Sequence, residues 1–444
     1  MSMDHAVGFR CATCGHTLDV TVVFPWRCPN ASDEDRRHVL QIVSSLAPLR
    51  VIDDPNPFVA FGPYFAWHAF ARAHGMSAEA CDALVREVDA QIAAVAGTGF
   101  AITGFRRRAA LSEELGFAAE GGVWVKDETG NVAGSHKARH LMSIMLHLRA
   151  AELLDLAPWH EAADRPPLAI ASCGNAAIAA STLAAATSWP ITVFVPPWAS
   201  PAVVDTLEGL GALIQVSPRL DDDPPGDPCI HRFRDAVAEG AIPFSVQGSE
   251  NALCLDGGRT IGWEMTESIG HLLDRVFVQV GGGALAACVG SAFRTAGIHP
   301  VVHAVQTAAC APLARAWERS GALAGGRSSA ATSWGECMWP WEADAAESGA
   351  GDATTAVAAG SLADGILDDE TYDWIGVLDA MSGTGGSPVV VTEAQVERAH
   401  ELAGLTTGES VSATGTAGLA GLLAIRDRID DGERVAVIFS GVQR

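Results

Sequence analysis

Short apolar runs alternate with segments of helical spacing over most of the chain. Most positions in these runs are apolar, and the runs occupy residues 123–125, 168–171, 191–195, 212–216, 276–280, 301–306, 389–391 and 435–439. Turn residues follow most runs, and helix-forming segments such as 138–148 and 393–403 come next. This alternation predicts an α/β protein with parallel, doubly wound sheets. A further helix is expected over residues 77–95, after a proline-rich and aromatic arm at 53–70.

One strand-to-helix connection carries an unusual lysine. Glycines and an asparagine between 130 and 134 mark a loop, and Ser135 is the expected N-cap of the next helix. Lys137 then lies in the first helical turn, where the helix dipole disfavours a cation. The chain has only one other lysine, Lys126, and otherwise uses arginine. Because lysine can form a Schiff base and arginine cannot, Lys137 is either an amine kept for pyridoxal phosphate (PLP) or an ordinary surface lysine.

Composition narrows the class of protein. The chain has 444 residues, 48% of them hydrophobic, which is enough for two or three globular domains. Its net charge of -24 argues against nucleic acid and anionic membranes as partners. No segment approaches the length of a membrane span, and the first ten residues lack the apolar core of a signal peptide. These features predict a cytoplasmic protein with reduced cysteines.

The first forty residues contain an incomplete metal-binding pattern. Cys11, Cys14 and Cys28 are candidate zinc ligands, but a tetrahedral site needs a fourth, and Ala31 stands where another cysteine is expected. The spacing does not choose among three histidines, which are His5, His16 and His38. A metal-free remnant of a zinc ribbon is the alternative.

Three further turns could bind anions or a ring nitrogen. The glycine turn comprises Gly281, Gly282, Gly283, Ala284 and Leu285. It follows a strand and opens a helix, so its N–H groups suit a phosphate. Ser172, Cys173, Gly174 and Asn175 form a similar turn that could hold a carboxylate, and Ser440 follows the last strand. Each turn taken alone could equally be an ordinary turn or cap.

Together these segments resemble the fold-type II (tryptophan-synthase-like) PLP enzymes, and threonine synthase most closely, over residues 103–444. The stretches that carry the resemblance are KDETGNVAGSHKAR at 126–139, SCGNAA at 172–177, VQVGGGALAA at 278–287 and IFSGVQR at 438–444. The resemblance implies that Lys137 is the Schiff-base lysine and that Asn175 lies near the PLP 3′-oxygen. It also implies that residues 172–174 face the substrate carboxylate, 281–285 the phosphate, and Ser440 the pyridine nitrogen.

The resemblance also implies an architecture. We expect two doubly wound parallel-sheet domains with the cofactor between them, and a homodimer. The expected parts are a degenerate zinc-ribbon-like segment at 1–40, a helical and aromatic arm at 41–102, and a catalytic core at 103–444 with a smaller mobile domain near 140–250. A glycine- and alanine-rich insertion is expected at 321–351.

Several reactions stay open at this stage. The first is a threonine synthase-like β- or γ-elimination or replacement on a small amino acid. The second is a serine/threonine ammonia-lyase (dehydratase) or a β-replacement synthase, and the third is a PLP-binding sensor without catalysis. Val132, Ala133 and His136 depart from the family's lysine motif, which indicates a specialised relative. His136 is a candidate for proton transfer or for packing.

Overall fold

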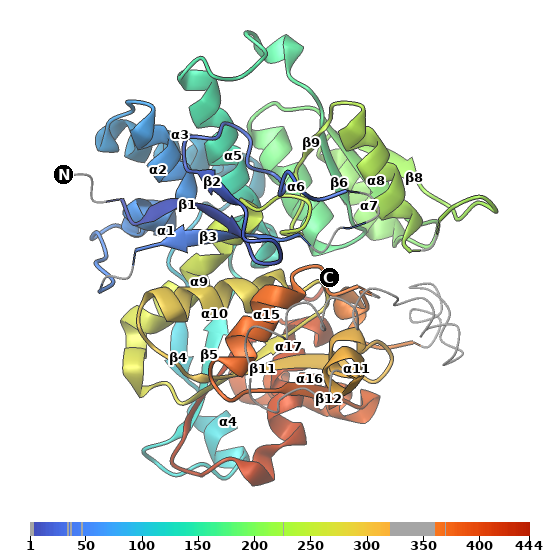
Figure 1. Cartoon of the computed structure of the whole chain (residues 1–444). Coiled ribbons are helices and arrows are strands. Elements are labelled where there is room, and N and C mark those ends of the chain that lie inside the picture. Colours follow the sequence, from blue (N-terminus) through green and yellow to red (C-terminus); the bar gives the residue numbers. More distant parts are fainter. Residues whose placement is uncertain are drawn as a thin grey trace. The chain divides into compact units, whose positions relative to one another are not determined.

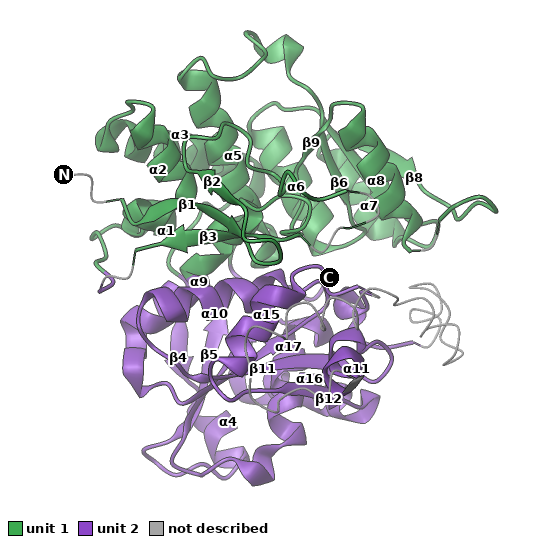
Figure 2. Cartoon of the chain, in the orientation of Figure 1, with its two compact units in different colours: residues 1–46, 50–102, 131–260 green, residues 47–49, 103–130, 261–444 purple. Residues whose placement is uncertain are grey.

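The computed structural model describes residues 4–444 except 33–34, 36–37, 46–47, 225, 320–359 and 369 (Figure 1). The chain forms two compact units (Figure 2). Unit 1 comprises residues 1–46, 50–102 and 131–260, and unit 2 comprises 47–49, 103–130 and 261–444. The insertion expected at 321–351 lies outside the described residues.

Unit 1 contains a four-stranded parallel sheet in the order β8-β7-β6-β9. Its strands are β6 (Leu168–Ala171), β7 (Ile191–Val195), β8 (Leu213–Val216) and β9 (Ile242–Pro243). The helices that follow these strands are α6 (Asn175–Ala186), α7 (Pro201–Gly209), α8 (Pro228–Ala238) and α9 (Cys254–Ile269), the last of which continues into unit 2. All four residues of β6 are buried, which explains why this strand is apolar at every position.

The N-terminal part of unit 1 adds a small antiparallel sheet and a group of helices. The sheet has the order β2-β1-β3 and consists of β1 (Ala6–Cys11), β2 (Thr17–Asp19) and β3 (Leu40–Ser44). The helices are α1 (Pro57–Ala60), α2 (Ala66–Ala73), α3 (Ala78–Ala96) and α5 (Lys137–Leu153). Helix α3 begins at the N-cap Ser77 and ends at Gly97, whose φ of 75° suits glycine.

Unit 2 is built on a six-stranded sheet in the order β12-β11-β10-β13-β5-β4. The strands are β4 (Phe105–Arg107), β5 (Gly122–Asp127), β10 (Arg275–Gln279), β11 (Val301–Thr307), β12 (Pro388–Val391) and β13 (Arg434–Phe439). All pairs are parallel except β4 with β5. The helices are α4 (Ala109–Glu114), α10 (Ala284–Thr295), α11 (Pro312–Arg319), α15 (Trp374–Ser382), α16 (Glu393–Thr407) and α17 (Ala413–Ala424).

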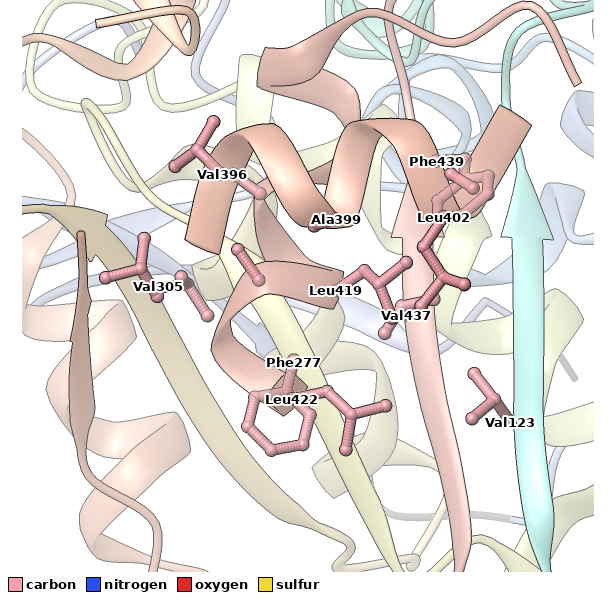
Figure 3. Close-up of a cluster of buried hydrophobic side chains, with 14 of the residues drawn as sticks. Val123, Phe277, Val305, Val396, Ala399, Leu402, Leu419, Leu422, Val437 and Phe439 are labelled. Atoms are coloured by element: carbon pink, nitrogen blue, oxygen red, sulfur yellow. The ribbon is translucent and has the colours of Figure 1, made fainter. Parts of the chain in front are cut away.

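The core of unit 2 lies where α16 and α17 cover the sheet (Figure 3). Val396 and Leu402 of α16 and Leu419 of α17 belong to the same buried cluster as the strand residues Phe277 and Val437 (Figure 3). Helix α16 starts at a capping box in which Thr392 and Gln395 bond each other's backbone N–H groups. The apolar helix faces and the apolar strands therefore bury one another, as the sequence pattern predicts.

The structure confirms the predicted α/β class with parallel sheets. It groups the segments expected as N-terminal ribbon, arm and smaller domain in one unit, because α2 and α3 pack against α5 and α6. Movement of any part of that unit stays a prediction. Among the residues that the structure describes, no helix is both long and apolar enough to cross a membrane.

Candidate active site

Lys137 is the first residue of α5 and is partly exposed. A tight turn precedes it, in which Ala133 and Gly134 have φ of 56° and 68°. The N-cap position belongs to His136, so the prediction of Ser135 as N-cap was wrong. Ser135 lies one residue further from the helix, and its hydroxyl accepts the N–H of Lys137 at 3.4 Å. The predicted place of Lys137 in the first turn is confirmed.

The other lysine is committed to an internal ion pair of unit 2. The Lys126 side chain is fully buried, and its Nζ contacts a carboxylate oxygen of Glu264 and donates to the Thr103 carbonyl at 2.9 Å. The Glu128 carboxylate lies 3.8 Å from the same Nζ. Removing this amine from its carboxylates would leave buried charges without a counter-ion. Lys126 is therefore committed to this ion pair, whereas Lys137 is partly exposed.

The first turns of α5 are clamped by the N-terminal half of α9. The buried Arg139 guanidinium donates to the Thr260 hydroxyl at 2.8 Å, and the His140 ring donates from Nδ1 to the Cys254 carbonyl at 2.8 Å. Gly257 lies so close to the Arg139 carbonyl that a Cβ there would fall inside 3.0 Å of it. These contacts hold the backbone beside Lys137 in place.

His136 lies directly before Lys137 and is buried. Its ring meets the His140 ring edge to face, with 5.5 Å between centroids. Burial, and then the neighbouring Lys137 charge, hold the pKa of His136 well below 6.5. The His136 ring is therefore neutral at physiological pH.

The second predicted turn of unit 1 follows β6. Ser172 donates its N–H to the Phe194 carbonyl at 3.2 Å, and its hydroxyl accepts the Gly174 N–H at 3.3 Å. Cys173 is exposed and Asn175 is the first residue of α6. The turn before Lys137 contacts α6, so Lys137 and Asn175 begin two helices that pack together within one unit. An N-terminal helix turn of this kind favours anions such as carboxylates.

The glycine turn of unit 2 connects β10 to α10. Gly283 is the N-cap of α10 with φ of 96°, a conformation that favours glycine. A Cβ at Gly281 would collide with the Asp368 carboxylate, and one at Gly282 would come to 3.0 Å from the Tyr372 ring. Ala284 and Leu285 form the first turn of α10, whose N–H groups have no acceptor within the helix. The turn is thus a close-fitting cradle with backbone donors.

Ser440 lies at the carboxyl end of β13, the neighbour of β10 in the sheet, and is buried. The Gly441 carbonyl accepts the Ser412 N–H at 2.8 Å at the start of α17. Gln279 at the end of β10 donates from Nε2 to the Ile438 carbonyl at 3.0 Å. Ser440 and the glycine turn therefore lie at the same edge of one sheet.

The structure adds one segment that sequence reasoning missed. Asp368, Tyr372 and Asp373 pack on the glycine turn, where the Asp373 N–H donates to the Gly282 carbonyl at 2.8 Å. The position of this segment depends on packing between distant parts of the chain, so no local sequence pattern predicts it.

These residues fit PLP in two respects. The glycine turn opens α10 with backbone N–H groups that have no acceptor within the helix, as a phosphate site needs. Lys126 is buried in its ion pair, whereas Lys137 is partly exposed at the start of α5. The predicted metal ligands also come together, since Cys11, Cys14, Cys28 and His38 have ligand atoms within 4.8 Å of one another.

Comparison with known proteins also indicates a PLP enzyme. A family model described as pyridoxal-phosphate dependent enzyme matches residues 97–441. A serine dehydratase-like protein of Mus musculus is 29% identical over 183 residues, which are 40% of this chain and 48% of that protein. The chain thus spans about half of that relative's length.

Solved structures share the fold. Maize serine racemase superposes with a TM-score of 0.58 at 17% identity, over 82% of this chain and 93% of that one. The processed form of threonine deaminase isoform 2 from Solanum lycopersicum gives a TM-score of 0.55 at 16% identity, over 83% and 86%.

Proposed function

The chain belongs to the family of pyridoxal-phosphate dependent enzymes, and we propose that it is a lyase that removes a side-chain substituent from a small amino acid. The observation that carries this proposal is the state of the two lysines. Lys126 is buried against Glu264, whereas Lys137 is partly exposed at the start of α5. Lys137, which follows the neutral His136, is therefore the position that we propose for the attachment of PLP.

Each predicted site residue receives a role in this proposal. Lys137 Nζ would hold the cofactor covalently and would serve as the base for the proton on the substrate Cα. The N–H groups of 281–285 hold the phosphate, and those of 172–174 hold the substrate carboxylate. Asn175 orients the ring through its amide. Bound PLP supplies an electron sink for the charge that develops at Cα.

Ser440 is proposed to face the pyridine nitrogen. A serine hydroxyl is neutral, so it does not stabilise a protonated ring nitrogen as a carboxylate would. The weaker electron sink favours loss of a leaving group over transamination. This supports β- or γ-elimination, with His136 kept neutral by its depressed pKa so that it adds no charge beside Lys137.

We favour β-elimination of the ammonia-lyase type as the first reaction to test, because the serine dehydratase-like protein is similar in sequence. A threonine synthase-like γ-elimination or a replacement reaction is the second candidate. Its support is the pair Cys11 and Cys14, which adds to the resemblance to threonine synthase. Release of a keto acid and ammonia from one substrate distinguishes an elimination from a replacement. Whether the substrate that is consumed carries its leaving group on Cβ or on Cγ then distinguishes β- from γ-elimination. A homodimer and a cytoplasmic location stay predictions.

The test is chemical trapping. The purified protein is saturated with PLP, reduced with borohydride, digested and mapped by mass spectrometry. We expect the label on Lys137, and a visible absorption band that changes when the correct amino acid is added. Lys137→Ala should lose the label and the band, whereas His160→Ala, a change at an exposed histidine of the same unit, should retain both. A label on Lys126, or none in the wild type, would overturn the assignment.

A second readout separates the enzyme from a sensor. Serine, threonine and their O-substituted analogues are added to the PLP-saturated wild-type protein, and the release of keto acid and ammonia is measured. A spectral change without product formation would support the PLP-binding sensor and refute the lyase.

A further inference from the structure

We propose that Cys11, Cys14, Cys28 and His38 bind one structural Zn²⁺ ion in unit 1. The four ligand atoms lie within 4.8 Å of one another, although the residues are spread over 28 positions of sequence, from 11 to 38. Cys11 ends β1, Cys14 follows in the next turn, Cys28 begins another turn, and His38 lies just before β3. Three of the four residues are buried, and Cys14 is exposed.

Two of the six distances among the ligand atoms match the edges of a tetrahedral zinc site. Zn–S bonds of about 2.3 Å place two sulfurs about 3.8 Å apart, and a Zn–N bond of about 2.0 Å places sulfur and nitrogen about 3.5 Å apart. The Cys14 and Cys28 sulfurs are 3.7 Å apart, and the Cys11 sulfur lies 3.5 Å from His38 Nδ1. Both values fit edges of one tetrahedron.

The surroundings also suit a bound cation. Asn30 donates from Nδ2 to the Cys14 sulfur at 3.3 Å, and the Cys14 N–H points to the Cys11 sulfur at 3.5 Å. Donors directed at sulfur stabilise thiolates. His38 turns Nδ1 toward the sulfurs, while the Asp35 carboxylate lies 3.6 Å from Nε2. A carboxylate behind a histidine orients the ring and strengthens it as a ligand.

The structure identifies His38 as the fourth ligand, which the spacing could not do. The register of β1 and β3 makes the choice, because Cys11 pairs with Leu40 and His38 therefore arrives beside Cys11. His5 is instead stacked on Tyr64, with ring centroids 4.3 Å apart.

The zinc site would fix the loop that contacts α5. Within unit 1, the Val23 carbonyl accepts a hydrogen bond from His147 Nε2 at 2.6 Å, and the Trp26 carbonyl accepts one from the Ala252 N–H at 2.9 Å. Phe24 stacks on Trp159 with 6.0 Å between centroids. All three contacts come from the loop between Cys14 and Cys28. A metal that closes this loop holds it on the helix that begins with Lys137.

The experiment measures metal in the whole chain, purified under reducing conditions without chelator. We expect about one zinc per chain by elemental analysis, and a drop of about tenfold or more in Cys14→Ser and His38→Ala. Cys173→Ser and His160→Ala, which change an exposed cysteine and an exposed histidine, should keep the full amount.

A second measurement covers the case in which a ligand variant does not fold. Apo wild-type protein is titrated with Co²⁺, whose intense visible bands report tetrahedral thiolate coordination, and Zn²⁺ is then added to displace it. Saturation at one equivalent supports the site. Wild-type protein that carries no zinc and gives no such bands, or that contains a Cys14–Cys28 disulfide under the same reducing conditions, would overturn the proposal.

Discussion

Substituting Gly257 with alanine should destabilise unit 1 and disturb Lys137. A Cβ at position 257 would fall inside 3.0 Å of the Arg139 carbonyl oxygen, and 2.8 Å from both the carbonyl carbon and the Ser143 hydroxyl. Ordinary contact begins at 3.4 Å, so the carbonyl carbon alone requires α9 and α5 to separate by about 0.6 Å. Rotating a side chain cannot relieve this clash, because the nearest atoms belong to the backbone.

The expected cost is the difference between two effects. Overpacking of a buried contact costs up to about 3 kcal/mol. The upper value applies here because the clashing atoms belong to the backbone and cannot rotate away. Alanine regains about 1 kcal/mol over glycine in a helix interior. Gly257→Ala should therefore lower the free energy of unfolding by about 2 kcal/mol. It should also reduce borohydride labelling of Lys137, because Arg139 is only two residues away.

Gly404 provides the matched control. It lies in the exposed part of α16, where a new Cβ would meet nothing within 4 Å. The same substitution there should raise the free energy of unfolding by up to about 1 kcal/mol. Urea unfolding followed by tryptophan fluorescence measures both variants. A Gly257→Ala midpoint at or above that of the wild type would refute the close contact between α9 and α5.

Three other predictions concern charge and backbone. Burial lowers the pKa of His147 to about 4, below its unfolded value of 6.5. The stability that the neutral ring contributes is therefore complete above pH 6.5, and about 3 kcal/mol of it is lost as the pH falls toward 4. The free energy of unfolding of His147→Gln, measured in urea, should depend less on pH across this window. Arg259→Met should cost about 3–5 kcal/mol of unfolding free energy by leaving the buried Asp256 carboxylate unpaired, and adding Asp256→Asn should recover part of that loss. Gly283→Ala should weaken PLP binding in a spectral titration, because φ is 96° and the Cβ would lie 3.0 Å from a neighbouring side chain, whereas Gly297→Ala, also at positive φ but in open space, should bind PLP as the wild type does.

Most strands were predictable because their signal is local. The runs at 168–171 and 191–195 coincide with β6 and β7, in which every residue except the partly buried Thr192 is apolar and buried. The antiparallel edge strand β4 was not predicted, because Phe105–Arg107 carries two arginines and owes its conformation to pairing with β5. Edge strands of this kind carry little periodic signal.

The candidate metal ligands were also predictable only in part. The cysteine spacing pointed to three ligands, because two of them share one short loop. His38 was only one of three candidates until the pairing of β1 with β3 placed it 3.5 Å from the Cys11 sulfur. The roles of Asn175 and Ser440 rest on the resemblance and stay predictions.

Neighbouring residues encode strands, caps and turns, so the amino-acid sequence was sufficient to predict the α/β class, the position of Lys137 at a helix start and the glycine turn before α10. The ion pair of Lys126 could be found only in the folded chain. Its counter-ion Glu264 lies 138 positions further along, and no local pattern can pair residues over that distance. Packing buries Lys126 against Glu264 and leaves Lys137 partly exposed at the start of α5, which is why we propose Lys137 as the lysine that binds PLP.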